Sequence, residues 1–277
     1  MSKPVIRHIA NLWSFFDYPS KENEWSLEQK VRSIKEAGFD GVCWSGGPEV
    51  RKLTKKFGLI FVGGMSSGKA ADFPRLLKEL KDTGAHHINV QVADEDTLTP
   101  EAVGLALLLI EAGRKLGVEP AVEIHRDTCT ETPEKAYALA DAYQKVTGEL
   151  LPMTFDFSHV SVVKHLAPPF AKRLLVRPDL IQRAQQFHFR PFNGHHCQVP
   201  VTDGKGNLTV EVKDYLEFVE AVIKTWLAGK QSGREMFACP EMGPVRGGYN
   251  LSTLPNSWED AKVLRGEIDK IWRKLNR

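Results

Sequence analysis

This sequence of 277 residues is poor in several features, and each scarcity narrows the range of functions. Its four cysteines are scattered and form no C-x-x-C pair, which argues against a disulfide scaffold or a zinc ribbon and favours a reducing compartment. The longest apolar run, Ala102–Ile110, is far too short to span a bilayer, and the N-terminus lacks the apolar stretch of a signal peptide. We therefore expect a cytoplasmic protein without a membrane segment.

An excess of charge of one sign is also missing, because 37 Lys and Arg side chains nearly balance 35 Asp and Glu side chains and leave a net charge of +2. Without a basic excess, the sequence predicts neither a nucleic-acid surface nor a polybasic membrane anchor. Apolar residues make up 42% and charged residues 26%, which is ordinary for a globular protein and excludes disorder, collagen and coiled coil. The expected partner is therefore a small molecule.

One pattern repeats from end to end of the chain: a short apolar run, a polar turn, a helical pattern and often a glycine. The apolar runs are rich in Val, Ile and Phe, as buried parallel strands are. Eight strands are expected, at Val5–Trp13, Gly41–Trp44, Leu59–Gly63, His87–Val92, Ala121–His125, Met153–Phe157, Phe187–Arg190 and Met236–Pro240.

Alternation of strands and helices predicts a parallel sheet, and eight such units in a chain of this length predict a closed (β/α)8 barrel, or TIM barrel. The alternative, a doubly wound open sheet, usually carries a glycine-rich turn after its first strand. The corresponding segment here, Trp13–Tyr18, contains no glycine, and the chain has no G-x-G-x-x-G motif. Because no linker is evident, residues 1–277 are expected to form a single barrel domain of the α/β class.

The last four expected strands each carry an ionisable side chain near their carboxyl end, where TIM barrels hold their active sites. These side chains belong to Glu123, Asp156, His188 and Glu241. A single acid at a strand end is more often a helix cap or an ion-pair partner. Three carboxylates that converge on one barrel mouth, however, would repel one another unless a cation compensated them. Three oxygen donors and one imidazole predict one divalent metal ion, with Mn²⁺ expected and Mg²⁺, Co²⁺ or Zn²⁺ as alternatives.

Three more polar side chains are expected near these ligands. His125 and Arg190 each lie two residues beyond a proposed ligand, so strand periodicity places them on the same face and nearer the mouth. His125 is then a candidate catalytic base and Arg190 a donor to a substrate oxygen; polar residues at a loop edge are the alternative for both. His159 lies in the segment that leaves the sixth strand and is expected to reach the substrate or a second metal.

Aromatic and basic side chains complete the expected mouth. Trp13 and Trp44 end the first two strands, where an aromatic ring can stack on the C–H face of a sugar; filling of the core is the alternative. Arg246 follows the eighth strand in a glycine-rich loop, at a place where many barrels bind phosphate. These three residues are candidates for binding a sugar or a sugar phosphate.

The ordered set Glu123, Asp156-x-x-His159, His188 and Glu241 resembles the xylose isomerase-like barrel superfamily of sugar isomerases and epimerases, and the resemblance covers the whole chain. In ketose 3-epimerases of that family, the matching Glu, Asp, His and Glu bind Mn²⁺ or a similar ion. The resemblance implies that Glu123 and Glu241 also act as acid and base and that His159 contacts substrate. It also suggests a homodimer.

The resulting hypothesis is a divalent-metal-dependent isomerase or epimerase of a sugar or sugar phosphate. A carboxylate removes the proton next to a carbonyl group, and the metal stabilises the enediolate. Glu123 and Glu241, which come from strands that are not neighbours, can address opposite faces of the sugar.

Two positions depart from the ketose 3-epimerase pattern, since Arg190 follows the metal histidine more closely and Cys129 stands in place of a glutamate. An alternative hypothesis therefore keeps the site and changes the reaction. In that alternative, the protein is a keto-sugar lyase, dehydratase or deglycosidase in which His125 is the base.

Two other hypotheses fit the sequence less well. An endonuclease IV-type phosphodiesterase needs additional histidine ligands on the early strands and a DNA-binding face, and this sequence offers neither. A non-catalytic sugar-binding barrel would not need the full set of four ligands.

Overall fold

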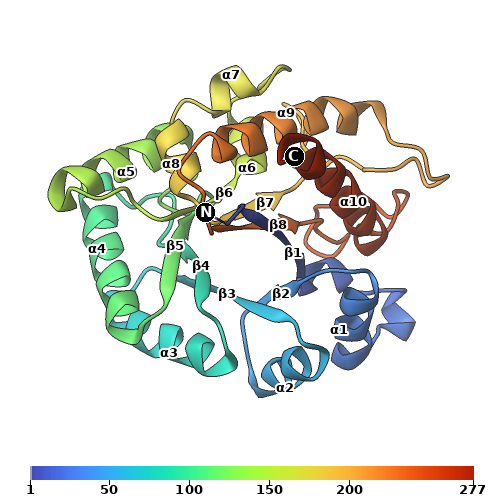
Figure 1. The fold of residues 1–277 in the computed structure, drawn as a ribbon, viewed down its shortest axis with the longest axis horizontal. Coiled ribbons are helices and arrows are strands. Elements are labelled where there is room, and N and C mark those ends of the chain that lie inside the picture. The colour runs from blue at the N-terminus through green and yellow to red at the C-terminus, as the bar shows by residue number, and fades with distance from the viewer. Residues whose placement is uncertain (1) are drawn as a thin grey trace.

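The computed structural model describes residues 2–277 and forms a closed barrel of parallel strands that follow one another around the ring from β1 to β8 (Figure 1). Each strand pairs with the next one along the chain, and β8 pairs with β1. The predicted TIM barrel is confirmed. The strands are β1 (Val5–Asn11), β2 (Gly41–Trp44), β3 (Ile60–Ser67), β4 (His87–Val92), β5 (Glu119–Glu123), β6 (Met153–Asp156), β7 (Gln186–Phe189) and β8 (Glu235–Pro240).

Helices surround the barrel and cover the outer faces of its strands (Figure 1). Among residues 2–277, no helix is long and apolar enough to cross a membrane. The helices are α1 (Leu27–Glu36), α2 (Pro48–Phe57), α3 (Phe73–Thr83), α4 (Thr99–Leu116), α5 (Pro133–Thr147), α6 (Phe157–Val163), α7 (Ala171–Leu174), α8 (Pro178–Arg183), α9 (Val210–Leu227) and α10 (Ser257–Leu275). Short 3-10 helices are η1 (Leu12–Phe15), η2 (Lys21–Asn23) and η3 (Ala70–Asp72).

Local sequence explains where several helices start, stop and pack. α1 begins at a capping box, in which the Gln29 side chain accepts a hydrogen bond from the Ser26 N–H (2.9 Å) and the Ser26 side chain accepts one from Gln29. α4 ends where Gly117 adopts a left-handed conformation with φ of 69°. α3 places Leu77 and Leu80 on one buried face, and this face packs against the strands.

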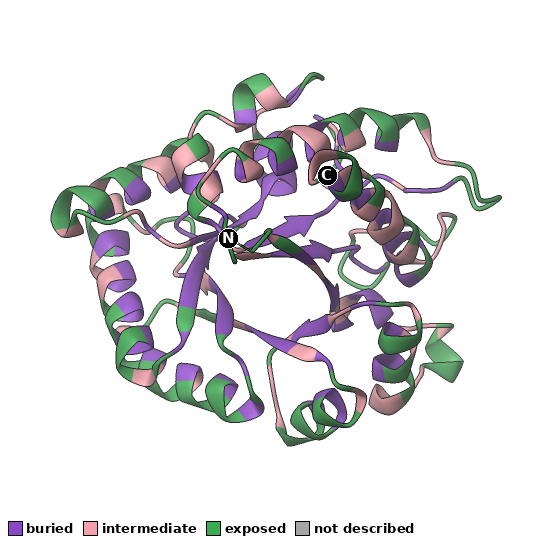
Figure 2. Cartoon of the chain, in the orientation of Figure 1, coloured by how far each residue is buried: buried purple, intermediate pink, exposed green. Residues whose placement is uncertain are grey.

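Side chains of the strands alternate between two hydrophobic regions, and Figure 2 shows that the strands are mostly buried. Outward-facing residues such as Val42 and Met236 join the large core between the strands and the helices. Inward-facing residues form a separate small cluster of Ile9, Cys43, Val62, Phe237 and Cys239. Because Cys43 also lines a cavity at the carboxyl ends of the strands, this inner cluster is the apolar floor of the candidate site.

Five strands end at other residues than predicted: β3 continues to Ser67, β7 stops at Phe189, and β1, β5 and β6 stop early beside candidate site residues. β1 stops at Asn11, because the Asn11 side chain accepts a hydrogen bond from Trp13 N (3.0 Å) and caps η1. β6 stops at Asp156, whose carboxylate accepts a hydrogen bond from the backbone N–H two residues further on (2.9 Å) and caps α6. β5 stops at Glu123, so that His125 lies in the following loop rather than on the strand.

Candidate metal centre

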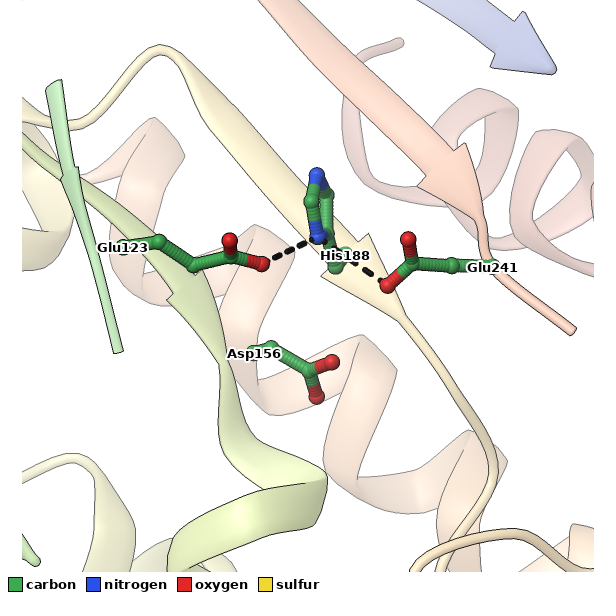
Figure 3. Close-up of side chains that lie close together, drawn as sticks. All are labelled: Glu123, Asp156, His188 and Glu241. Carbon is green, nitrogen blue, oxygen red and sulfur yellow. Dashed lines mark ion pairs between the residues drawn. The ribbon is translucent and has the colours of Figure 1, made fainter. Parts of the chain in front are cut away.

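Four ionisable side chains meet at the carboxyl ends of β5 to β8 (Figure 3). Glu123, Asp156, His188 and Glu241 each offer one ligand atom, and these atoms lie within 4.8 Å of one another. His188 Nδ1 is 2.8 Å from Glu123 Oε1 and 3.1 Å from Glu241 Oε2. The parallel register explains part of this meeting, because Asp156 and His188 are direct partners across β6 and β7. The structure thus brings the four predicted ligands together.

All four side chains are buried, so that their charges interact strongly with one another. Burial alone would lower the pKa of His188, but the carboxylates of Glu241 and Glu123 raise it well above its ordinary value. Burial alone would raise the pKa of Glu123, yet the nearby His188 lowers it to about 2. The pKa of Asp156 also lies below its ordinary value, because the Arg190 guanidinium outweighs the effect of burial. The carboxylates are therefore ionised at neutral pH.

The buried ligand atoms and the charge balance of this cluster fit a divalent cation. Asp156 Oδ2 and His188 Nδ1 are buried and lie within ion-pair distance of oppositely charged groups, but neither makes an aligned hydrogen bond to a described residue. Three carboxylates and one guanidinium leave two negative charges, which one divalent ion would neutralise beside a neutral imidazole. The Gln186 side-chain nitrogen lies 2.8 Å from His188 Nε2, and turning this amide over would let its oxygen accept a proton from Nε2 and leave Nδ1 free to bind a cation.

The cluster faces a cavity of about 410 Å³, which is within the usual range for small-molecule sites. Three of the four ligands line this cavity, whereas Asp156 lies behind them. Trp13 and Trp44 are among its walls, together with Met65 and Tyr249. The cavity can therefore place a small polar molecule between aromatic side chains and the ligand cluster.

Solved structures with the same architecture identify the fold. D-allulose 3-epimerase from Methylomonas sp. matches with a TM-score of 0.60 at 15% sequence identity, over 99% of this chain and 99% of its own. A xylose isomerase-like TIM barrel protein from Mycobacterium smegmatis, in complex with magnesium, matches with a TM-score of 0.58 at 16% identity, over 97% of both chains. The fold is xylose isomerase-like.

The same fold is shared by the probable 3-DHS dehydratase AsbF from Bacillus anthracis, with a TM-score of 0.60 at 16% identity, over 94% of this chain and 98% of that one. No protein-family model and no curated protein matches the sequence. The similarity to these proteins therefore lies in the fold. It is the fold that the resemblance noted in the sequence analysis implied.

In this xylose isomerase-like barrel, neutral amide side chains hold the two candidate ligand glutamates. The sequence analysis did not identify these amides. Asn89 Nδ2 and Gln91 Nε2 both donate to Glu123 Oε2, at 2.7 Å and 3.0 Å. Across the site, Asn11 Nδ2 donates to Glu241 Oε1 at 2.5 Å. Each of these amide residues occupies an inward-facing strand position near the carboxyl end of its strand. An amide at such a position is the sequence signal that could have identified these three residues.

The Arg190 side chain forms ion pairs with two of the candidate ligands, which its position in the sequence did not predict. The side chain is 1% exposed, and its guanidinium lies 2.6 Å from Glu241 Oε2 and 3.2 Å from Asp156 Oδ2. It also lies over the rings of Trp13 and Tyr249, at 5.4 Å and 4.7 Å from their centroids. Arg190 borders the cavity, but its charge is largely engaged in compensating the ligand carboxylates.

The two candidate histidines pack against each other, with ring centroids 4.1 Å apart, but only one of them lines the cavity. His125 lines it, and its Nδ1 is 2.6 Å from the carbonyl oxygen of Arg126. His159 is buried behind it, with Nε2 3.4 Å from Asp156 Oδ2. The three-residue spacing at the start of α6 turns His159 back toward Asp156, because residues three apart on a helix share a face.

The remaining predicted residue, Arg246, is exposed and lies outside the lining of the cavity. Its guanidinium is 5.3 Å from the centroid of the Phe16 ring. Arg126, which the sequence analysis did not identify, lines the cavity instead and lies over Tyr249 at 4.9 Å. Arg126 follows β5 in an irregular loop, where no periodic pattern indicates the direction of a side chain.

Proposed function

We propose that this protein is a divalent-metal-dependent isomerase or epimerase that removes a proton next to a carbonyl group of a sugar or sugar-derived substrate. The observation that carries the proposal is the buried cluster of Glu123, Asp156, His188 and Glu241 beside a cavity of about 410 Å³. Buried charges are costly, and they are retained where they hold a metal or do chemistry. The structural neighbour solved in complex with D-allulose supports a sugar substrate.

The four clustered side chains are the proposed metal ligands, and Mn²⁺ is the proposed ion, with Mg²⁺, Co²⁺ or Zn²⁺ as alternatives. Three carboxylates and one imidazole are donors that such cations accept. The neighbour in complex with magnesium supports a hard cation. When bound, the cation would polarise a substrate carbonyl as a Lewis acid.

Glu123 is the proposed proton acceptor. Its Oε2 accepts two amide hydrogen bonds, whereas its Oε1 faces His188 at the base of the cavity. Its low pKa makes it a weak base, so that the substrate carbon must be acidified by the polarised carbonyl next to it. Glu241 faces the cluster from β8, on the other side of His188, and is the proposed acid for return of a proton to the opposite face.

Trp13 and Trp44 are the proposed stacking surfaces for the sugar ring. Both side chains are partly exposed and line the cavity on the side of β1 and β2, away from Glu123 on β5. Aromatic faces suit the C–H side of a sugar, whereas the hydroxyl groups of the sugar need polar partners. The amides of Asn89 and Gln91, which also line the cavity, are neutral groups of that kind.

One observation favours a second candidate, a keto-sugar lyase or dehydratase. Because His125 Nδ1 contacts a carbonyl oxygen, the ring proton resides on Nδ1 and Nε2 keeps a free lone pair. Nε2 would take a proton from the carbon next to the carbonyl, the C–H electrons would form a carbon–carbon double bond, and the group on the adjacent carbon would leave. The neighbour described as a probable dehydratase supports this alternative.

Metal content is the first test. Mass spectrometry should find about one divalent ion per chain in the purified protein, and His188→Ala should lose it, because His188 lies between two carboxylates. His8→Ala is a matched control, since His8 is a buried histidine of β1 that lies beside Asp269, away from the cluster. No ion in the wild type, even after incubation with Mn²⁺, Mg²⁺, Co²⁺ and Zn²⁺, would contradict both candidates.

The second test identifies the reaction. Metal-loaded protein in D2O would be incubated with ketoses, aldoses and keto-glycosides, and the products examined by NMR. Deuterium next to a carbonyl in an epimer or isomer supports the first candidate, whereas an unsaturated product supports the second. His125→Asn should retain exchange in the first case and lose product formation in the second.

A further inference from the structure

A second cavity of about 590 Å³ lies beside the one that the metal ligands face. Residues 193–200, between β7 and α9, and residues 248–254, between β8 and α10, form most of its walls. We call the cavity at the metal ligands the reaction cavity and this neighbour the side cavity. Tyr249 lines both of them, so that the two are separated by one side chain at this point.

Apolar side chains form much of the side cavity. They are Val162, Val199, Pro200, Leu251 and Leu254. Leu251 is 64% exposed and forms an open part of this apolar wall. Polar side chains are also present, among them His195, His196 and Glu211. A cavity of this kind binds an apolar group that carries few polar atoms, rather than a second sugar ring with many hydroxyl groups.

Hydrogen bonds hold the walls of the side cavity in place. Gln198 donates to the carbonyl oxygen of Gly243 (2.9 Å) and accepts from its N–H (2.6 Å), which ties the β7–α9 loop to the β8–α10 loop. Asp260 on α10 accepts from the N–H groups of Val201 (2.7 Å) and Thr202 (3.2 Å). The cavity is therefore preformed, as small-molecule sites usually are, and does not depend on the folding of a loose loop.

The shared wall is also fixed. Two guanidinium groups, those of Arg190 and Arg126, lie over the Tyr249 ring at 4.7 Å and 4.9 Å, and Trp13 meets it edge-on at 4.8 Å. Gly243 allows this packing, because a Cβ atom there would lie 2.6 Å from Tyr249 Cβ. Tyr249 thus holds a fixed position between the two cavities, and because it is partly exposed, a ligand that occupies both can pass over the outer edge of its ring.

We propose that the side cavity binds an aromatic substituent of the substrate, while the sugar ring of the same molecule occupies the reaction cavity. This inference rests on the proposed function, since it extends the proposed sugar site. It narrows the substrate class from free monosaccharides to sugars that carry an aryl group, such as aryl glycosides. Leu251 is the specificity residue that would become covered by the aryl group.

Binding of a matched pair of glucosides tests the inference without turnover. Isothermal titration calorimetry of the metal-loaded protein would compare 4-nitrophenyl β-D-glucopyranoside with methyl β-D-glucopyranoside. The aryl compound should bind about tenfold more tightly, because it buries a ring and the apolar side chains around it. Leu251→Asp should remove most of this difference and leave the methyl glucoside unaffected. Leu108→Asp, on an exposed leucine of α4 outside both cavities, should leave both affinities unchanged.

The outcomes separate this inference from the proposed function. Equal affinities for the two glucosides, or an aryl preference that survives in Leu251→Asp, would overturn the inference. Deuterium exchange into keto-sugars, measured separately, reports on the proposed function alone. An aryl preference without any exchange would leave the inference standing and overturn the proposed reaction. Failure of both glucosides to bind would overturn the inference whatever the exchange result.

Discussion

The two glutamates of the candidate metal centre flank His188, yet they are held in different ways. Glu123 receives hydrogen bonds from two neutral amides of β4. Glu241 receives one from an amide of β1 and an ion pair from the guanidinium of Arg190. Arg190 therefore compensates the charge of Glu241, whereas Glu123 faces no guanidinium and lies near two histidines, His188 and His125.

From this difference we expect the two carboxylates to have different roles. A guanidinium that lies 2.6 Å away keeps Glu241 ionised and fixes it as a ligand. Amide donors orient Glu123 without adding an opposite charge, so that its basicity responds more to what occupies the cavity. The predictions below test whether Glu123 removes the substrate proton, whereas Glu241 contributes mainly as a ligand and returns a proton to the opposite face.

The largest effect is expected on proton exchange. Glu123→Gln keeps the shape of the side chain but removes the proton acceptor, and it should slow exchange at saturating metal by about 10²–10⁴-fold. Glu241→Gln is the matched variant, and we expect it to lose metal affinity more than exchange rate. NMR exchange rates measured over a metal titration provide the check. An equal loss of exchange rate in the two variants at saturating metal would remove the distinction between them.

Arg190→Met should have the next largest effect, on stability. The substitution leaves Asp156 and Glu241 buried without their cation, which typically costs about 3–5 kcal/mol in the free energy of unfolding. Urea denaturation at constant metal concentration measures this cost. Arg126→Met is the control, because Arg126 is exposed and packs on the same Tyr249 ring, and its effect should stay within about 0.5 kcal/mol. Similar costs in the two variants would contradict the role of Arg190.

Removal of the metal should have a smaller effect on stability. At a free metal concentration of about 100 times Kd, binding adds about 2.7 kcal/mol to the free energy of unfolding, and a chelator should remove it. Thermal unfolding with and without EDTA would show a lower Tm in the chelated wild type. His188→Ala should show no such difference, and a chelator effect of the same size in that variant would place the ion elsewhere.

The smallest effect is expected for the amides. Asn89→Ala removes one of the two donors to Glu123 and should weaken metal binding about tenfold, as the loss of a group that orients a ligand commonly does. Asn11→Ala should weaken it less, because Arg190 still holds Glu241. Competition with a chromophoric chelator measures both. A larger loss of metal affinity in Asn11→Ala than in Asn89→Ala would show that the amide of β1, and not the guanidinium, positions Glu241.

Most of the barrel could be predicted because a buried parallel strand leaves a clear pattern in the sequence. All eight strands lie where apolar runs predicted them, and the capping box of Ser26 and Gln29 begins α1 as the local sequence indicates. The errors lie at strand ends, where one side-chain hydrogen bond decides whether the strand continues. Asn11 caps η1 and Asp156 caps α6, and both bonds depend on backbone geometry that an apolar pattern does not report.

The ligands of the candidate site could be predicted for a similar reason, since a charge within an apolar strand is conspicuous. Neutral amides such as Asn89 and Gln91 are not conspicuous, because the same residues are common at any strand end or turn. The direction of His159 could not be predicted either, since it depends on α6 starting directly after β6. Contacts between distant segments, such as the one between Arg190 and Tyr249, leave no pattern in the sequence.

The proposed metal ligands all come from one half of the barrel, β5 to β8, whereas the first half contributes only uncharged side chains to the reaction cavity. Some of these side chains, such as Trp44, Ser45 and Met65, make no hydrogen bond to a ligand. A laboratory-evolution library confined to these three positions would therefore vary the shape offered to a substrate without touching the ligands. These three positions are open to redesign, whereas the amides of the same half, which hold Glu123 and Glu241, are not.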